Sequence, residues 1–184
     1  MLLMAGASAS GKTEIAKIII KKYGFKKMVT YTTRPMRDGE VDGVDYNFIS
    51  FEDFREQECN NEFLETTTYN GNCYGTKFKD ASFDKVLIVD TFGANSIYEK
   101  MPDDVTIFFL ESPKEIRAKR MKERGDSECD IAKRLNGDDL YFNINNLVHV
   151  DYVIDSSEKK LEDLADEIFK LYNKKGTIWN WWLF

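Results

Sequence analysis

The residues that first suggest chemistry form a glycine-rich segment with one lysine, Gly6-Ala7-Ser8-Ala9-Ser10-Gly11-Lys12-Thr13. This segment matches G-x-x-x-x-G-K-[ST], the motif of loops that hold nucleotide phosphates. Backbone N–H groups of such a loop surround phosphate oxygens, while the lysine neutralises their charge and the hydroxyl binds Mg²⁺. The whole segment is therefore a candidate ATP-binding site, with Lys12 as a catalytic residue and Thr13 as a metal ligand.

The flanking residues predict the elements that would hold this loop. An apolar run at residues 2–5 predicts a strand before it, and helical spacing of apolar residues predicts a helix over residues 14–23, ended by Gly24. The N-terminus of that helix would face the loop, where its dipole and unpaired N–H groups favour an anion. Strand, loop and helix thus occur in the order that phosphate binding requires.

Further along the chain, the pattern predicts an α/β fold. Continuous apolar runs at residues 86–90 and 105–110 are typical of parallel strands buried on both faces. Helix-like segments separate them, and a last strand at 151–155 precedes a closing helix at 158–175. The predicted architecture is a parallel-sheet core interrupted by two smaller parts.

The two interruptions differ in composition. Residues 30–77 are polar with short strand signals, which predicts a small inserted β-rich lobe, whereas residues 113–147 are rich in charge and predict a helical lid. We therefore expect a single domain over residues 1–184, divided into a core (1–30, 78–118 and 148–184), an inserted lobe (31–77) and a lid (119–147).

A second motif lies inside the predicted lobe, at Thr32-Thr33-Arg34-Pro35-Met36-Arg37-Asp38-Gly39-Glu40-Val41-Asp42-Gly43-Val44-Asp45-Tyr46-Asn47-Phe48. It resembles the guanylate kinase signature T-[ST]-R-x-x-[KR]-x-x-[DE]-x-x-G-x-x-Y-x-F at every fixed position. With the phosphate loop ahead of it and residues 61–65 and 74–76 behind it, the resemblance covers nearly the whole chain. It implies a P-loop enzyme of purine metabolism that converts ATP and GMP to ADP and GDP with Mg²⁺ as cofactor.

The resemblance assigns the GMP phosphate to Arg34, Arg37, Tyr46 and Tyr74, with Arg34 also catalytic. Two guanidinium groups and a phenol can hold a dianionic monophosphate through charge-assisted hydrogen bonds. Without the full signature, two arginines in a polar loop would more often form a solvated surface.

The resemblance also implies that Glu65 recognises guanine, with Thr76 and Thr30 as hydroxyl partners to the base. Guanine presents an N1–H and an exocyclic amine side by side, so one carboxylate can accept from both, whereas adenine lacks both donors on that edge. Sites built on such hydrogen bonds discriminate by about 10⁴- to 10⁵-fold. An isolated glutamate on a strand would more often be an exposed edge charge.

The lid arginines are expected at the donor. The resemblance places Arg120, Arg124 and Arg134 over the ATP phosphates when the lid closes, and a solvated basic helix face is the alternative. Asp90 ends an apolar run and is expected to bind Mg²⁺ or GMP, although it could instead cap the next helix. GMP is already ionised, because a monophosphate has its second pKa near 6, so no catalytic base is needed.

Three residues depart from the pattern of many relatives. Ala9 stands where glycine is common, Ile88 where an aspartate is common, and Asp155 where an asparagine lies near the adenine pocket. The four defining positions of the phosphate loop are intact, so we expect any effect of these residues to fall on rate and nucleotide preference and not on reaction class.

Composition limits the partners. The net charge of -6 argues against a general nucleic-acid surface, and no apolar stretch reaches the length of about 20 residues that a membrane span needs. The three cysteines predict neither a disulfide framework nor a zinc site, which favours a cytoplasmic location. ATP and GMP are the expected partners, with dGMP left open and a monomer or weak homodimer expected.

Two features have no assigned function. His149, the single histidine, is expected to be structural. The aromatic segment at residues 177–184 could pack on the core or mediate self-association.

Two other functions stay open. A guanylate-kinase-like binding module would recognise a phosphorylated partner through the arginines of the second motif, but such modules typically degrade the phosphate loop. A kinase for another metabolite or nucleoside monophosphate would share the loop, and Glu65 with Thr76 argues against it. Acceptor specificity distinguishes these possibilities.

Overall fold

The structure, a computed structural model, describes residues 1–69 and 71–175. The chain forms two compact units: the core unit comprises residues 1–26 and the chain from residue 83 onward, and the inserted unit comprises residues 27–82. The predicted aromatic segment at 177–184 lies outside the described residues. Each unit has its own sheet, so each is considered separately.

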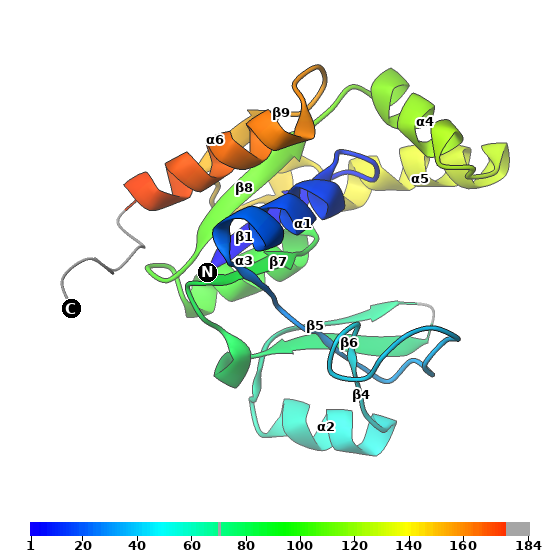
Figure 1. Cartoon of the computed structure of the whole chain (residues 1–184). Helices are drawn as coiled ribbons and strands as arrows, with labels where there is room; N and C mark the ends of the chain where they lie inside the picture. The colour runs from blue at the N-terminus through cyan, green and yellow to red at the C-terminus, as the bar shows by residue number, and fades with distance from the viewer. Residues whose placement is uncertain (70, 176–184) are drawn as a thin grey trace. The chain divides into compact units, whose positions relative to one another are not determined.

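The core unit is built on a five-stranded sheet in the order β2-β7-β1-β8-β9 (Figure 1). Its strands are β1 (Leu2–Gly6), β2 (Lys26–Lys27), β7 (Lys85–Ile88), β8 (Thr106–Glu111) and β9 (Tyr152–Asp155). Strand β1 pairs in parallel with β7 and β8, and β8 pairs in parallel with β9. All five residues of β1 are buried, as expected for a central parallel strand. The predicted α/β class with a parallel sheet is confirmed.

The helices of the core unit are α1 (Lys12–Tyr23), α3 (Thr91–Lys100), α4 (Lys114–Glu123), α5 (Glu128–Tyr141) and α6 (Leu161–Lys174), with a short 3₁₀ turn η2 (Ile144–Asn146). Helices α1 and α6 lie side by side against one face of the sheet, and α3 contacts β1 from the other face (Figure 1). One buried cluster joins Leu2 of β1, Ile15 and Ile19 of α1, and Ile168 of α6. Burial of each such side chain contributes about 1.5–3 kcal/mol.

Two helix boundaries differ from their predicted positions for local reasons. Helix α1 begins at Lys12, because Gly11 adopts a left-handed conformation with φ of 95° and serves as its N-cap. Helix α6 begins at Leu161 instead of residue 158, since the Asp155 carboxylate accepts the backbone N–H and hydroxyl of Ser157 and holds a turn there. The predicted end of α1 at Gly24 is confirmed, with φ of 74°.

The inserted unit contains a four-stranded sheet in the order β4-β3-β6-β5. Its elements are β3 (Tyr31–Thr32), β4 (Asn47–Phe48), α2 (Phe51–Cys59), β5 (Phe63–Tyr69), β6 (Asn72–Lys77) and the 3₁₀ turn η1 (Phe78–Asp80). Phe54 of α2 stacks on Phe63 with ring centroids 4.5 Å apart. A Cβ at Gly75 would approach the Phe63 ring to 2.8 Å, so the sheet is closely covered on this face. Because side chains alternate along a strand, Tyr74 and Thr76 belong to the opposite face.

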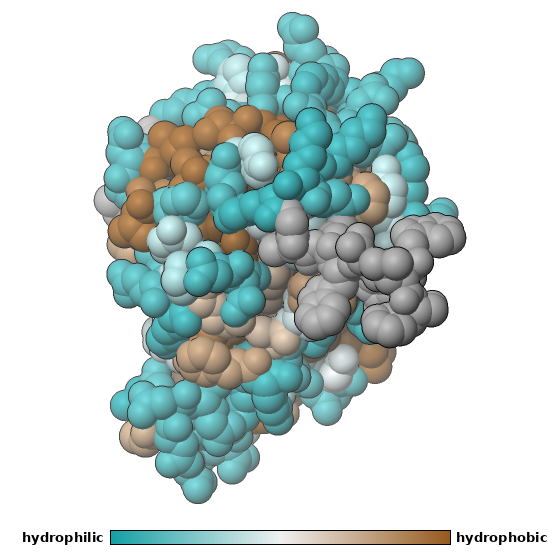
Figure 2. Space-filling view, turned by 90° about the vertical axis from the view of Figure 1, so that its left-hand side faces the viewer, coloured by the Kyte–Doolittle hydropathy of each residue, from teal (hydrophilic) through white to brown (hydrophobic). Residues whose placement is uncertain are grey.

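Figure 2 shows one face of the molecule. Hydrophilic residues make up most of the face shown in Figure 2, and hydrophobic residues gather in part of it. Within residues 1–69 and 71–175, we find no helix that combines the length and the apolar character needed to cross a membrane.

Candidate functional site

The phosphate loop connects β1 to α1 with a backbone that two glycines make possible. Gly6 has φ of 142°, and a Cβ at this position would lie 2.4 Å from the carbonyl oxygen of Leu110 on the adjacent strand β8. Gly11 has φ of 95° where the loop enters the helix. Both fixed glycines of the motif are therefore required by conformation, and Gly6 also by space.

Ala9 adopts a left-handed conformation with φ of 59°, which is costly for a residue that has a Cβ. We therefore expect Ala9→Gly to raise the free energy of unfolding by ~1 kcal/mol in urea titrations. Gly24→Ala is the matched control: its φ of 74° is also left-handed and an added Cβ meets no atom within 4 Å, so this variant should lose stability. A less stable Ala9→Gly protein would contradict the expected strain.

Lys12 lies inside the loop. Its Nζ donates to the carbonyl oxygens of Gly6 at 2.6 Å and Ala7 at 2.7 Å, and to Ser10 Oγ at 3.3 Å. Burial lowers the pKa of Lys12 to about 8, while the nearby Asp138 carboxylate acts in the opposite direction. The ammonium is thus held where a phosphate oxygen would compete with the loop carbonyls for it.

This lowered pKa predicts a pH dependence. Lys12 is charged below a pH of about 8 and becomes neutral above it, so kcat/KM for ATP should fall as pH rises through that value. Steady-state kinetics with saturating acceptor, from neutral pH to two units above the pKa, would measure the descending limb. Circular dichroism over the same range controls for unfolding. A profile that stays flat well above the pKa would contradict the assignment of the charge to Lys12.

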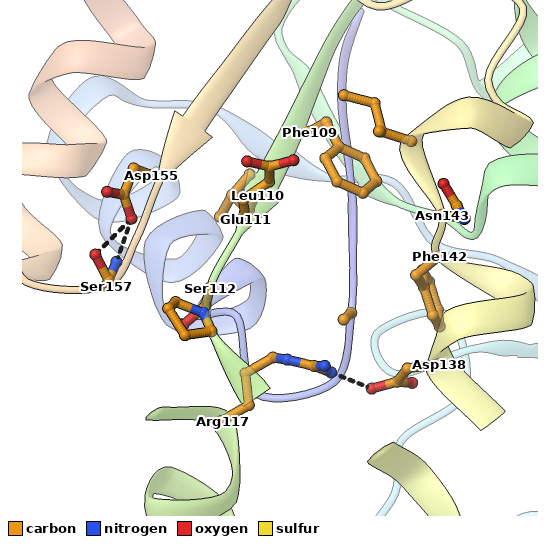
Figure 3. A pocket seen from close by; sticks show the side chains of 13 residues that line it. Phe109, Leu110, Glu111, Ser112, Arg117, Asp138, Phe142, Asn143, Asp155 and Ser157 are labelled. Atoms are coloured by element: carbon orange, nitrogen blue, oxygen red, sulfur yellow. Dashed lines mark hydrogen bonds and ion pairs between the residues drawn. The ribbon is translucent and has the colours of Figure 1, made fainter. Parts of the chain in front are cut away.

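An aspartate on α5 contacts the loop, and no motif indicated it. Asp138 accepts the backbone N–H of Ser8 at 2.9 Å and the Ser8 hydroxyl at 3.0 Å, one on each carboxylate oxygen. Arg117 of α4 donates to the same carboxylate at 2.6 Å, and both members of this pair are buried (Figure 3). The sequence offers only their charges as a signal, since their spacing matches no pattern.

The three predicted lid arginines occupy different places. Arg120 donates to the carbonyl oxygens of Ala9 at 3.2 Å and Ser156 at 2.6 Å, so it contacts the phosphate loop directly. Arg120 and Arg124 also line a cavity of about 440 Å³ together with Lys12 and Thr13.

Arg124 and Arg134 converge on Asp126, in the turn between α4 and α5. Arg124 forms a close ion pair with Asp126, and Arg134 Nη1 lies 3.9 Å from the same carboxylate. Half of the Arg134 side chain is exposed. In this structure, therefore, Arg120 meets the loop backbone while the other two are held by Asp126.

Asp90 caps α3 in this structure, accepting the backbone N–H of Gly93 at 2.7 Å. Because β7 and β1 are parallel neighbours, Asp90 and the phosphate loop follow the same edge of the sheet. A carboxylate and the Thr13 hydroxyl are oxygen ligands of the kind that Mg²⁺ prefers, and phosphates and water commonly complete its shell. The donor set thus fits Mg²⁺, although the described residues hold no cluster of three or more acidic, histidine or cysteine side chains around one point.

In the inserted unit, Arg34 lies beside two tyrosines. Its guanidinium is 5.3 Å from the centroid of the Tyr46 ring, and the rings of Tyr46 and Tyr74 meet edge to face with centroids 6.1 Å apart. Arg34 also pairs with Glu40 at 2.7 Å, and this hydrogen bond lowers the pKa of Glu40. Arg37 donates its backbone N–H to Glu40 at 2.8 Å. Three of the four residues predicted to hold the GMP phosphate are thus brought together.

The residues predicted to recognise guanine lie on or next to three neighbouring strands. Glu65 on β5 pairs with Thr76 on β6, and both are buried. Thr30 precedes β3 by one residue, next to the antiparallel pair Tyr31 and Gly75, so the register places it opposite Thr76. The buried Thr76 Oγ1 has no hydrogen-bond partner among the described residues. This face of the sheet therefore combines a carboxylate with an unsatisfied hydroxyl.

Residues 1–171 match the family model described as Guanylate kinase. The chain belongs to the guanylate kinase family. It is 34% identical to the guanylate kinase of Neisseria gonorrhoeae, covering 89% of this chain and 84% of the relative. It is 36% identical to the guanylate kinase of Syntrophus aciditrophicus, and the match covers 89% of this chain and 82% of the relative. The crystal structure of guanylate kinase from Anaplasma phagocytophilum aligns with a TM-score of 0.70 and 26% identity, over 95% of this chain and 85% of that chain. The family predicted from the second motif is confirmed, and the chain is an enzyme.

The structure also describes two other residues singled out in the sequence, His149 and Ile88. His149 stacks on Tyr98 with ring centroids 4.4 Å apart, and its Nε2 lies 3.1 Å from Asp151 Oδ1. Ile88 ends β7 and is 38% exposed. His149 is packed and hydrogen-bonded as a structural histidine would be.

Proposed function

We propose that this guanylate kinase transfers the γ-phosphoryl group of ATP to GMP, giving ADP and GDP. The observation that carries the proposal is the buried Glu65–Thr76 pair with its unsatisfied hydroxyl. A carboxylate suits the N1–H and amine of guanine, and the hydroxyl supplies a further polar contact to the base. Combined with an intact phosphate loop, this pair supports GMP as acceptor and ATP as donor.

In the proposed reaction, the chain positions two charged groups and neutralises them. Lys12 and the N–H groups of its loop hold the donor phosphates, while Arg34 and Tyr46 hold the phosphate of GMP. Arg120, already beside the loop, adds positive charge at the donor. Mg²⁺ held by Thr13 and Asp90 would neutralise further charge on the donor phosphates. The nucleophile is an ionised phosphate oxygen, so catalysis depends on orientation and electrostatics without a general base.

The biological setting follows from the substrates. A kinase that converts GMP to GDP belongs to purine nucleotide metabolism, and we propose a cytoplasmic location with ATP and GMP as its small-molecule partners. Acceptance of dGMP depends on contacts to the ribose 2′-hydroxyl, to which no residue has been assigned.

An acceptor panel tests the proposal. ADP formation from ATP and Mg²⁺ is measured with GMP, dGMP, AMP, UMP and CMP supplied separately. Turnover confined to guanine nucleotides is the expected result. Binding of GMP without turnover would favour a binding module, and turnover with a different monophosphate would assign another acceptor, so either outcome would overturn the proposal.

A further inference from the structure

The contact between Asp138 and Ser8 has the chemistry of a bound phosphate. One carboxylate places its two oxygens on the backbone N–H and the hydroxyl of Ser8, which is a residue of the phosphate loop. Loops of this type bind the oxygens of an anion through such groups. Asp138 thus presents to the loop the same kind of charged oxygen that the donor nucleotide presents.

The cations around Asp138 are also those expected around a phosphate. Arg117 donates to it at 2.6 Å, and the charge of Asp138 raises the pKa of Lys12 against the larger effect of burial. The Nε atom of Arg117 is buried and has no hydrogen-bond partner among the described residues. One N–H of the guanidinium is therefore left unused, so Arg117 is incompletely satisfied in this arrangement.

The contact also connects two distant parts of the core unit. Asp138 lies on α5 and Arg117 on α4, whereas Ser8 belongs to the loop after β1. Figure 3 shows Arg117 extending from α4 towards Asp138 beside the pocket that these elements line. A donor phosphate on Ser8 and the Asp138 carboxylate cannot share these donors, because two anions at hydrogen-bond distance repel strongly in a buried site.

We infer that Asp138 is a built-in competitor for the donor phosphate, so that ATP binds to the loop only after α5 has withdrawn this carboxylate from Ser8. The inference rests on the proposed function, since it takes ATP as the ligand of the loop. It makes the nucleotide-free protein self-inhibited, and it couples donor binding to movement of α5. Loss of the carboxylate removes the competitor and increases the affinity for phosphate-bearing ligands.

The test measures dissociation constants by titration calorimetry for MgATP, tripolyphosphate and adenosine. Asp138→Asn should bind MgATP and tripolyphosphate about tenfold more tightly, the factor expected if about nine in ten nucleotide-free molecules form the contact. Affinity for adenosine should not change, because adenosine has no phosphate to compete with the carboxylate. Glu128→Gln, which removes an exposed negative charge from the same helix, is the matched control and should resemble the wild type.

A second variant is needed because Asp138→Asn leaves Arg117 buried without its counterion, which can destabilise the fold. Arg117→Leu/Asp138→Ala replaces the buried pair by apolar side chains, an exchange that proteins often tolerate. It should also bind tripolyphosphate more tightly than the wild type, because the competing carboxylate is absent, although the loss of the Arg117 charge makes the gain smaller than about tenfold. Folded variants that bind MgATP no better than the wild type would overturn the inference and leave the kinase function standing. A wild-type protein that binds no MgATP and transfers no phosphoryl group would overturn the proposed function itself.

Discussion

Lys12→Ala is expected to lower kcat for phosphoryl transfer by about 10³-fold or more, the largest effect of any single substitution outside the glycines of the loop. Removal of one preorganised charge that stabilises a transferring phosphoryl group typically costs 10² to 10⁵ in rate. Lys12 is the only lysine that the structure places among the carbonyls of the phosphate loop within the described residues. Steady-state ADP formation with saturating GMP measures the loss.

Lys17→Ala is the matched control for Lys12→Ala. It removes a lysine from the same helix, but its side chain is largely exposed and forms an ion pair with Glu14 at 2.8 Å. Turnover should remain close to that of the wild type. Thermal melting of the Lys12 variant is needed as well, because its ammonium also bridges three groups of the loop. A folded Lys12→Ala enzyme with wild-type kcat would contradict the role assigned to the loop.

Glu65→Gln should lower kcat/KM for GMP by about 10²-fold or more while the dissociation constant for ATP stays the same. The amide keeps one acceptor but turns an NH₂ group towards a base edge that consists of donors, so a buried donor is left unpaired. The effect should fall on the acceptor, because Glu65 is assigned to the guanine base and no contact with ATP is assigned to it. Initial rates over a GMP series, with ATP affinity measured separately, give both quantities.

Glu56→Gln provides the control for this substitution, because Glu56 is an exposed carboxylate on α2 of the same unit. It should leave the kinetics with GMP unchanged. Equal use of GMP by the wild type and by Glu65→Gln would remove the assigned recognition of guanine. Thr76→Val tests the neighbouring hydroxyl and should affect GMP more weakly, since only a neutral hydrogen bond is lost.

The sheet of the core unit was largely predictable because its strands are apolar without interruption. Leu2 to Ala5 and the run that became β8 are apolar throughout, as in a sheet covered on both faces, and Gly24 set the end of α1. The exact residues at which helices begin depended on particular contacts. The start of α6 is an example, since the hydrogen bonds of Asp155 to Ser157 do not follow from hydropathy.

Residues of the candidate site were predictable where a motif fixes their spacing. The phosphate loop has local rules, and the left-handed Gly11 and the crowded Gly6 show what those rules require. Arg34 and Tyr46 are separated by eleven positions within one signature, which predicted that they lie close together. Pairing of Glu65 with Thr76 needed the register of β5 and β6, which only the resemblance could suggest.

Asp138 and Arg117 could not be found in this way. They meet Ser8 through tertiary packing, across 130 residues in the case of Asp138, and a charged segment predicts only an exposed helix face. A buried ion pair at the loop is visible only when α4, α5 and β1 are placed together. The capping of α3 by Asp90 was foreseen as one of two alternatives, and the structure shows that contact directly.

The most direct test of the central claim follows the transferred group itself. The wild-type enzyme is incubated with GMP, Mg²⁺ and ATP that carries a radioactive γ-phosphorus, and the nucleotides are separated by chromatography. Transfer of the γ-phosphoryl group to GMP predicts that the label moves from ATP to GDP in proportion to the ADP formed. Label that remains in ATP, or that appears as inorganic phosphate while GMP is unchanged, would contradict it.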